Sequence, residues 1–181
     1  MDMTPAEKLI ALMLADAGRG AGERDGLDYN LIYAAIAEGN IWALDHQYFY
    51  LDAESEVPKD VAHEALGIMD MWYLFESIYN QFDDQEKAYI EREADPYGSN
   101  VRFSGFDANG EGKHYSAATF SVDHLRMFDS FRERDMNSHR PTLPAYRRMK
   151  VVWDELVRNG EIEGLTVDNA VRLLTAQRYP E

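Results

Sequence analysis

Residues 58–82 read PKDVAHEALGIMDMWYLFESIYNQF and contain the longest apolar pattern in the chain. Apolar side chains recur there in alternating steps of four and three, which is the period of an α-helix. This row consists of Val61, Ala65, Ile68, Trp72, Phe75, Tyr79 and Phe82, and beside it lie Ala62, Leu66, Met69 and Tyr73. Because so wide an apolar surface must be covered on more than one side, the stretch predicts the long central helix of a multi-helix bundle.

The apolar surface of this helix has two interpretations. Ile68, Trp72, Phe75 and Tyr79 can form the core of one chain, or they can form the seam of a homodimer. Both interpretations require neighbouring helices that enclose the surface.

The N-terminal segment carries clear signals for a helix. Thr4 and Glu7 have the spacing of a capping box, and Pro5 suits the first helical position. Gly18 is a natural stop. Between these signals lies one apolar stripe, made of Ala6, Leu9, Ile10, Met13, Leu14 and Ala17.

The rest of the chain is also predicted to be mainly α-helical. Further apolar periods or helix start signals occur around residues 31–36, 41–51, 83–93, 125–131, 144–156 and 167–174. Residues 101–120 are the least helical part. There, Asn109-Gly110 is a hairpin signal, so we expect a short two-stranded β-ribbon near 101–120.

Charge is distributed unevenly along the chain. The net charge is −15, and the whole excess lies in residues 1–98, since residues 99–181 carry equal numbers of acidic and basic side chains. The change coincides with a helix break at Asp95-Pro96. Neither half looks self-sufficient, so we interpret residues 1–181 as a single domain, with no boundary near 95–100. An acidic surface repels phosphate, which argues against binding to nucleic acid or anionic lipid.

The chain contains no cysteine, which excludes disulfides and suits a reducing compartment. Its first residues lack the basic and apolar regions of a signal peptide, and no apolar run approaches about 20 residues. We therefore expect a soluble cytoplasmic protein without a membrane partner.

No pattern in the sequence defines a catalytic or metal site. Asp107, Asn109 and Glu111 imitate the start of a calcium loop, but its twelfth position falls on Ala118 instead of a glutamate. His63 and Glu64 lack the further ligands of a metal site. There is no Gly-x-Ser-x-Gly nucleophile motif. We expect no catalytic residues, no metal and no cofactor.

The segment 132–150 is the basic exception, with six basic and two acidic side chains. Three interpretations compete: pairing with the acidic first half, an ordinary solvated face, or a site for a phosphate-bearing ligand. For the third, the candidate ligand-binding residues are His139, Arg140, Arg147, Arg148 and Lys150.

Three motifs together resemble one protein family. They are IMDMWY at 68–73, VRFSGFD at 101–107 and PAYRRMKVVW at 144–153. In this order and at these spacings they resemble the YfbU family, over nearly the whole chain. The resemblance implies a mainly α-helical fold and a bacterial cytoplasmic setting, and it supplies neither an activity nor catalytic residues.

Two functional hypotheses arise from the sequence. The first is a non-enzymatic, oligomeric interaction or regulatory protein, with a homodimer favoured and the identity of any other protein partner left open. The alternative is an enzyme or sensor for a small phosphorylated or nucleotide ligand, bound by the basic segment 132–150.

Overall fold

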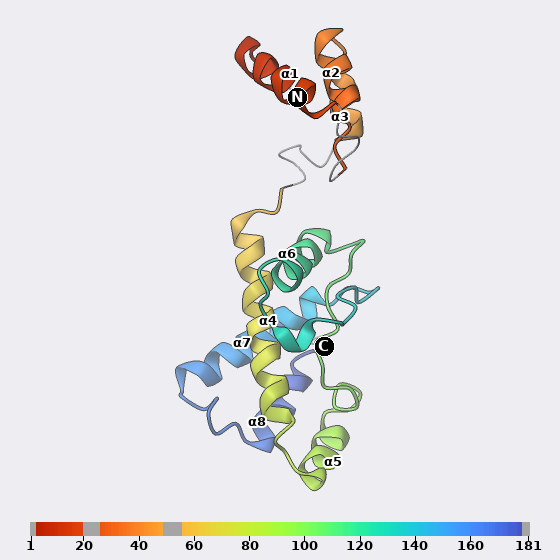
Figure 1. Cartoon of the computed structure of the whole chain (residues 1–181). Helices are drawn as coiled ribbons and strands as arrows, with labels where there is room; N and C mark the ends of the chain where they lie inside the picture. Colours follow the sequence, from red (N-terminus) through yellow and green to blue (C-terminus); the bar gives the residue numbers. More distant parts are fainter. Residues whose placement is uncertain (1–2, 20–25, 49–55, 179–181) are drawn as a thin grey trace. The chain divides into compact units, whose positions relative to one another are not determined.

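The computed structural model describes residues 3–19, 26–48 and 56–178 of the chain (Figure 1). These residues form eight α-helices and one short 3-10 helix at Asp129–Phe131. The α-helices are α1 Pro5–Gly18, α2 Tyr29–Ala37, α3 Trp42–Gln47, α4 Lys59–Tyr79, α5 Asp84–Glu93, α6 Gly112–Asp123, α7 Leu143–Arg158 and α8 Val167–Thr175. The prediction of a mainly α-helical fold is confirmed. No helix in the described part of the chain has the length and apolar character needed to cross a bilayer.

The backbone groups into two compact units. The first contains α1 to α3, within residues 1–56, and the second contains α4 to α8, within residues 57–181. Each has its own cluster of buried apolar side chains. The interpretation of residues 1–181 as a single domain remains a prediction.

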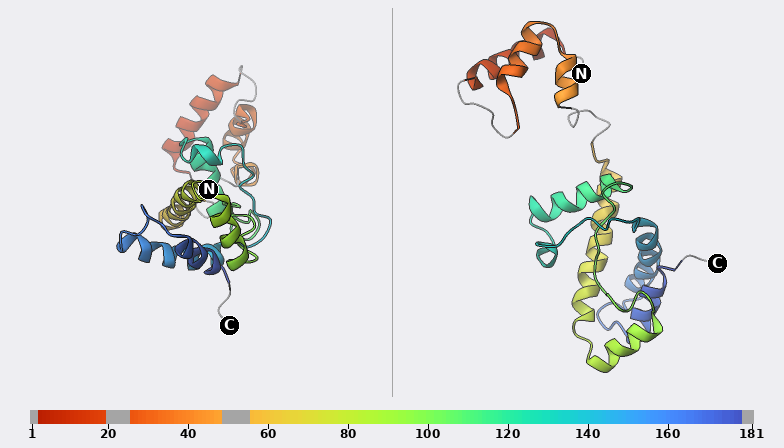
Figure 2. Two further views of the ribbon diagram at one scale, coloured as in Figure 1. Left: turned by 90° about the horizontal axis from the view of Figure 1, so that it is seen from below. Right: turned by 90° about the vertical axis from the view of Figure 1, so that its right-hand side faces the viewer.

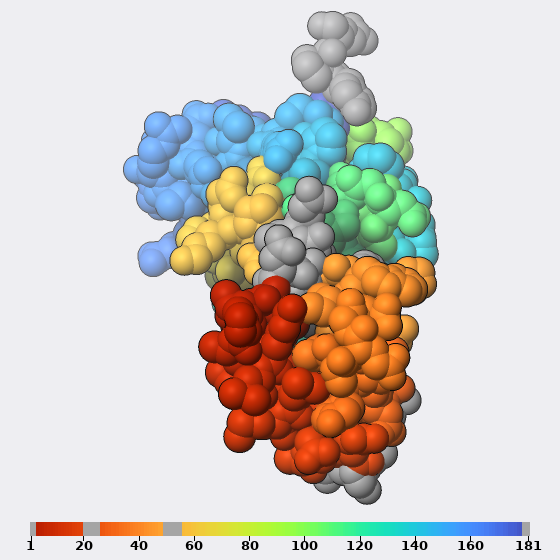
Figure 3. Space-filling model, turned by 90° about the horizontal axis from the view of Figure 1, so that it is seen from above, coloured from red at the N-terminus to blue at the C-terminus, as the bar shows by residue number. Residues whose placement is uncertain are grey.

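The first unit begins with the expected capping box. The Thr4 hydroxyl accepts the Glu7 N–H at 3.3 Å, and the Thr4 N–H donates to the Glu7 carboxylate at 2.7 Å. Helices α1 and α2 pack side by side (Figure 3). The centre of the unit is small and is made of Ala35, Ile36, Leu44 and Tyr48, with Ala11 and Leu12 of α1 packed against it.

Helix α1 carries apolar side chains on two faces. Ala11, Leu12 and Ala15 lie on the face that is buried or half-buried. The stripe that stands out in the sequence lies on the other, exposed face, where Leu9, Ile10, Met13 and Leu14 have exposed fractions of 60%, 58%, 66% and 67%. Ala6 and Ala17 extend this face at its two ends and are also exposed.

The second unit is built around α4, as the apolar pattern of residues 58–82 predicts. Helix α6 packs against one part of α4 and α7 against another, while α8 contacts both α5 and α7 (Figure 2). The buried side chains of α4 recur in steps of three and four, which places them on one broad face. They meet Met149, Trp153 and Leu156 of α7 and Leu173 of α8 in one continuous core.

The expected β-ribbon near 101–120 is wrong. Residues 112–123 form α6, and the segment 101–111 contributes an isolated parallel bridge between Phe106 and Asn137 rather than a strand. Helix α6 forms because its inward residues recur at helical spacing: His114, Ala117, Ala118, Ser121 and Val122 are all buried. The Asn109-Gly110 turn is real, but it leads from an irregular segment into this helix rather than into a second strand.

Two buried carboxylates hold the irregular segments in place. Glu76 of α4 accepts the Phe103 N–H at 2.6 Å and forms a two-pronged ion pair with Arg134, at 2.9 and 2.8 Å. Glu111 accepts the N–H groups of Thr142 and Leu143 at 2.9 and 2.7 Å, at the start of α7. Both carboxylates satisfy backbone groups that would otherwise be buried without partners.

Candidate functional site

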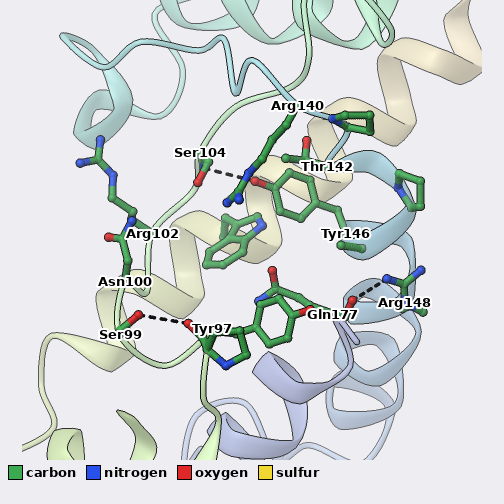
Figure 4. A pocket seen from close by; sticks show the side chains of 15 residues that line it. Tyr97, Ser99, Asn100, Arg102, Ser104, Arg140, Thr142, Tyr146, Arg148 and Gln177 are labelled. Carbon is green, nitrogen blue, oxygen red and sulfur yellow. Dashed lines mark hydrogen bonds between the residues drawn. The ribbon is translucent and has the colours of Figure 1, made fainter. Parts of the chain in front are cut away.

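A cavity in the second unit has a volume of about 360 Å³ (Figure 4). It lies where the start of α7 meets the irregular segments 96–104 and 140–142 and the residues directly after α8. The described residues that line it are Trp72, Pro96, Tyr97, Ser99, Asn100, Arg102, Ser104, Arg140, Pro141, Thr142, Pro144, Ala145, Tyr146, Arg148 and Gln177. We call this cavity the arginine pocket, after its three arginines.

Aromatic side chains form an inner wall of the arginine pocket. The Trp72 ring packs edge-on against Tyr146, with centroids 5.6 Å apart, and it packs at a tilt against Phe103, with centroids 6.5 Å apart. Trp72 is 2% exposed, and its indole N–H has no hydrogen-bond partner among the described residues. The Tyr146 hydroxyl accepts the Ser104 N–H at 3.2 Å. Burial raises the pKa of Tyr146 to about 12, so the phenol stays protonated at neutral pH.

The three arginines differ in what they already contact. Arg148 donates from its Nε to the Ala176 carbonyl at 3.1 Å and from a second nitrogen to the Gln177 carbonyl, so it ties α7 to the end of α8. Arg102 and Arg140 are exposed, and neither forms an ion pair within the described residues. In Figure 4 the Arg140 guanidinium reaches over the pocket beside the Tyr146 hydroxyl, while that of Arg102 extends away from its centre.

The lining combines positive charge with a lack of acidic groups. None of the described lining residues is an aspartate, a glutamate or a histidine. Arg102 and Arg140, which form no ion pair within the described residues, raise the local potential of this concave, partly apolar site and attract anions. The arginine pocket can therefore bind a negatively charged small molecule.

The structure separates the five ligand-binding candidates of the segment 132–150. Arg140 and Arg148 line the arginine pocket. Arg147 and Lys150 instead line a different, shallower depression together with Glu64 and Asp154. His139 is exposed, with its Nε2 at 3.4 Å from Asp135.

Pairing with the acidic half of the chain accounts for part of the basic segment. Arg147 binds Glu64 of α4 through two hydrogen bonds, at 2.6 and 2.8 Å. Arg134 binds Glu76 of the same helix. Lys150 pairs locally with Asp154.

The residues named as a core or oligomer seam lie on the inward side of α4. Ile68, Trp72 and Phe75 are 2%, 2% and 0% exposed, and each belongs to the core of the second unit. Tyr79 is half-buried and packs against that core. Helices of the same chain therefore enclose these side chains.

The sequence reasoning missed the other wall of the arginine pocket and the environment of Glu64. Tyr97, Arg102 and Ser104 come from the irregular stretch in and just before the segment that was expected to form a ribbon. The VRFSGFD motif at 101–107 was the available signal, because irregular sequence that helical periodicity does not explain often shapes a site. The sequence around Glu64 relates it only to its neighbours on the helix, whereas its carboxylate contacts His114 Nε2 at 2.8 Å, fifty residues away. No group of three or more potential metal ligands is gathered among the residues with a described position.

The fold and the arginine pocket define a class: a mainly α-helical protein whose central helix supports an arginine-lined cavity. The model of the YfbU domain matches residues 1–176, and the chain belongs to the YfbU family. One relative is the UPF0304 protein MJECS11 of Methanocaldococcus jannaschii, 26% identical over 104 residues. The match covers 55% of this chain and 58% of the relative, so it spans less than two thirds of that protein's length. Neither the family description nor the relative's name states an activity.

Proposed function

We propose that this protein is a non-enzymatic regulatory module that binds a small phosphorylated or nucleotide ligand in the arginine pocket. The observation that carries the proposal is that Arg102 and Arg140 line one cavity without an ion pair among the described residues, and that no carboxylate is among the described residues that line it. The cavity volume of about 360 Å³ lies in the range of small-molecule sites, which is about 300–1,000 Å³.

A phosphate group fits this lining better than a cation or a neutral ligand does. The planar guanidinium group presents parallel N–H donors that match two phosphate oxygens. Arg140 is placed to provide such a pair over the pocket, and Asn100 adds a neutral polar group on the side where Ser99 and Arg102 lie (Figure 4). The aromatic inner wall offers apolar contact to the remaining, organic part of the ligand.

The groups around the pocket favour binding over chemistry. General acid–base catalysis needs a side chain that gains and loses a proton near the working pH. Arginine does not do this, and burial raises the pKa of Tyr146 to about 12. Among the described residues that line it, the pocket thus supplies charge and shape but no carboxylate or imidazole to carry a proton, as is expected of a sensor.

A bacterial cytoplasmic setting belongs to the same proposal. The absence of cysteine suits a reducing compartment. Nucleotides and phosphorylated metabolites are abundant in that compartment, so a pocket of this charge would meet its ligands there.

Calorimetric titration with nucleoside monophosphates, sugar phosphates and inorganic phosphate tests the proposal. At least one of these probes should bind the wild-type protein, and Arg140→Ala should weaken that binding about tenfold or more, because a charge-assisted hydrogen bond is worth about 1.5–3 kcal/mol. Affinity should also fall with added salt.

Arg132→Ala is the matched control. Arg132 belongs to the same basic segment but is exposed and pairs with Asp129, away from the arginine pocket. It should leave the affinity unchanged. The proposal fails if none of the probes binds at millimolar concentration, or if Arg132→Ala weakens binding as much as Arg140→Ala does.

A further inference from the structure

We infer that the exposed face of α1 is an interface for a second copy of this chain, in which the two α1 helices pack antiparallel across a two-fold axis. We call this surface the α1 face; it consists of Ala6, Leu9, Ile10, Met13, Leu14 and Ala17. The inference is independent of the arginine pocket, which lies in the other unit.

The α1 face is more apolar than the solvent-exposed face of a surface helix usually is. Its four large residues are each more than half exposed, although α1 is only 14 residues long. Residues 9–15 include no charged side chain. Single exposed apolar residues are normal on a protein surface, but a contiguous group of this kind marks an interaction site.

The opposite side of α1 already packs against the core of the first unit, so the helix cannot rotate about its axis to bury the α1 face. Ala11, Leu12 and Ala15 pack inward within the first unit. At Gly18 the fit to α2 is so close that an added Cβ would lie 2.6 Å from the Tyr29 ring. This contact fixes the rotation of α1 about its axis and keeps the α1 face outward.

The order of side-chain sizes along the face suits pairing with itself. Counted from the midpoint between residues 11 and 12, Ile10 mirrors Met13, Leu9 mirrors Leu14 and Ala6 mirrors Ala17. When two α1 helices lie antiparallel, each of these residues therefore lies beside the residue of the other helix that mirrors it, and the two have similar sizes. The large residues fill the centre of the seam, and the small alanines at both ends let the backbones approach. A two-fold interface requires this kind of self-complementary surface.

Charge favours the antiparallel arrangement over the parallel one. Antiparallel helices set opposite ends of their macrodipoles side by side, whereas parallel helices set like ends together. Asp16 borders the face, and across the axis the two copies of Asp16 would lie about 14 Å apart along the helices, from a rise of 1.5 Å per residue. At that separation salt screens most of their repulsion.

A protein partner suits the α1 face better than a lipid surface does. Helices that lie on membranes border their apolar face with lysine and arginine, which attract anionic lipids. Here Glu7 and Asp16 outnumber Lys8 within α1, and the whole chain carries a net charge of −15. A second copy of this acidic chain can still bind here, because the residues of the α1 face that would meet in the interface carry no charge.

The size of the face sets the expected strength of the dimer. One face of a 14-residue helix is smaller than the roughly 800 Å² per partner that a standard stable interface buries. We therefore expect a concentration-dependent dimer with a dissociation constant in the micromolar range.

The lack of native cysteine allows a direct test of both contact and direction. In the Ala6→Cys/Ala17→Cys variant, residue 6 of one copy faces residue 17 of the other, so mild oxidation should give a covalent dimer of twice 20.8 kDa. Either single variant should give no covalent dimer under the same conditions, because equivalent residues lie about 16 Å apart along an antiparallel pair. Val151→Cys/Val157→Cys, on exposed positions of α7, controls for random collision.

Sedimentation equilibrium provides a measurement that does not depend on cysteine. The wild-type chain should dimerise at tens of micromolar, and Met13→Glu should be monomeric with an unchanged circular dichroism spectrum. Val151→Glu should dimerise like the wild type. A wild-type monomer at hundreds of micromolar would overturn the inference, and so would cross-linking of the α7 control as fast as that of the double variant. Efficient cross-linking of Ala6→Cys alone would overturn the antiparallel arrangement.

Discussion

Glu64 shows how one residue can join three helices. It lies on α4, binds Arg147 of α7 through both carboxylate oxygens, and contacts the buried His114 of α6. The hydrogen bonds from Arg147 are the largest cause that lowers the pKa of Glu64 from its ordinary 4.5 to about 2, and His114 adds to the effect. The ionised form of Glu64 is therefore favoured in the folded protein.

This pKa shift predicts how stability depends on pH. Because the folded pKa is the lower one, the contribution of Glu64 is complete above about pH 5 and is lost as the pH falls towards 2. The full shift corresponds to about 3 kcal/mol. Since Arg147 is 56% exposed and Glu64 is 32% exposed, solvent screening reduces the expected contribution to about 1–2 kcal/mol.

Urea unfolding at pH 7 and at pH 3 measures this contribution. Glu64→Gln should be less stable than the wild type at pH 7, and the difference should shrink at pH 3. A difference of equal size at both pH values would show that the ionised Glu64 is not the group responsible.

At the residue scale, sequence separation decides what could be predicted. The Thr4–Glu7 capping box was predictable because its partners lie three residues apart and have a known spacing. Arg147 and Glu64 are 83 residues apart, and nothing in either neighbourhood identifies the other. The sequence could state only that arginines of segment 132–150 had acidic partners available.

At the scale of elements, Gly105 sets the course of the irregular segment. Its φ of +82° is in the left-handed region, and an added Cβ would lie 1.9 Å from the Met136 carbonyl oxygen. That oxygen accepts the Phe106 N–H at 2.9 Å, in the bridge between the two irregular segments. Gly105 thus permits both the turn and the close approach of the two backbones.

Gly105→Ala should destabilise the protein by about 3 kcal/mol or more, because the left-handed strain of about 1–2 kcal/mol is joined by a clash with the backbone. Gly160→Ala is the matched control. Gly160 also has a positive φ, of +71°, but no described atom lies within 4 Å of an added Cβ. Gly160→Ala should lower the free energy of unfolding only by the left-handed backbone strain, about 1–2 kcal/mol. Chemical denaturation compares the two variants, and equal losses would rule out the clash.

The elements that could be predicted are those with a long, regular apolar period. Helix α4 was predictable from its apolar rows, and α7 from the spacing of Tyr146, Met149, Trp153 and Leu156. The ribbon prediction failed because a turn signal specifies a bend but not whether a strand or a helix comes after it. Asp107 accepts the Asn109 N–H at 3.1 Å, which closes the turn locally, and α6 begins at Gly112.

At the scale of the molecule, the described core residues form two separate clusters. One contains residues between Met3 and Tyr48, and the other contains residues between Val57 and Ala176. The larger cluster holds Trp72 and Trp153. A domain needs its own core to fold alone, and the second unit has one.

A fragment of residues 57–181 should therefore fold by itself. It should unfold cooperatively, with a thermal midpoint within a few degrees of the main transition of the whole chain, and its near-ultraviolet circular dichroism should keep the signal of its buried tryptophans. Differential scanning calorimetry of the fragment and of the whole chain checks this. An unfolded fragment would favour the single-domain interpretation of residues 1–181.

The charge distribution also has its explanation at this scale. Acidic residues of α4 lie in the acidic half of the sequence, yet they belong to the second unit, where they bind arginines from the basic segment. The change of charge near residues 95–100 therefore falls inside that unit. Counting charges along the sequence could reveal the imbalance but not how the fold distributes it.

The contacts of Glu111 at the start of α7 limit how this sequence can change during evolution. Thr142, at the start of α7, makes no side-chain capping bond of its own, and the carboxylate of Glu111 takes that place from 31 residues earlier in the chain. The Thr142 hydroxyl also contacts Glu111, at 3.1 Å. The N–H groups that Glu111 accepts belong to the backbone of residues 142 and 143, so every residue except proline at those positions keeps them. Among descendants of this protein, position 111 should therefore vary less than position 142.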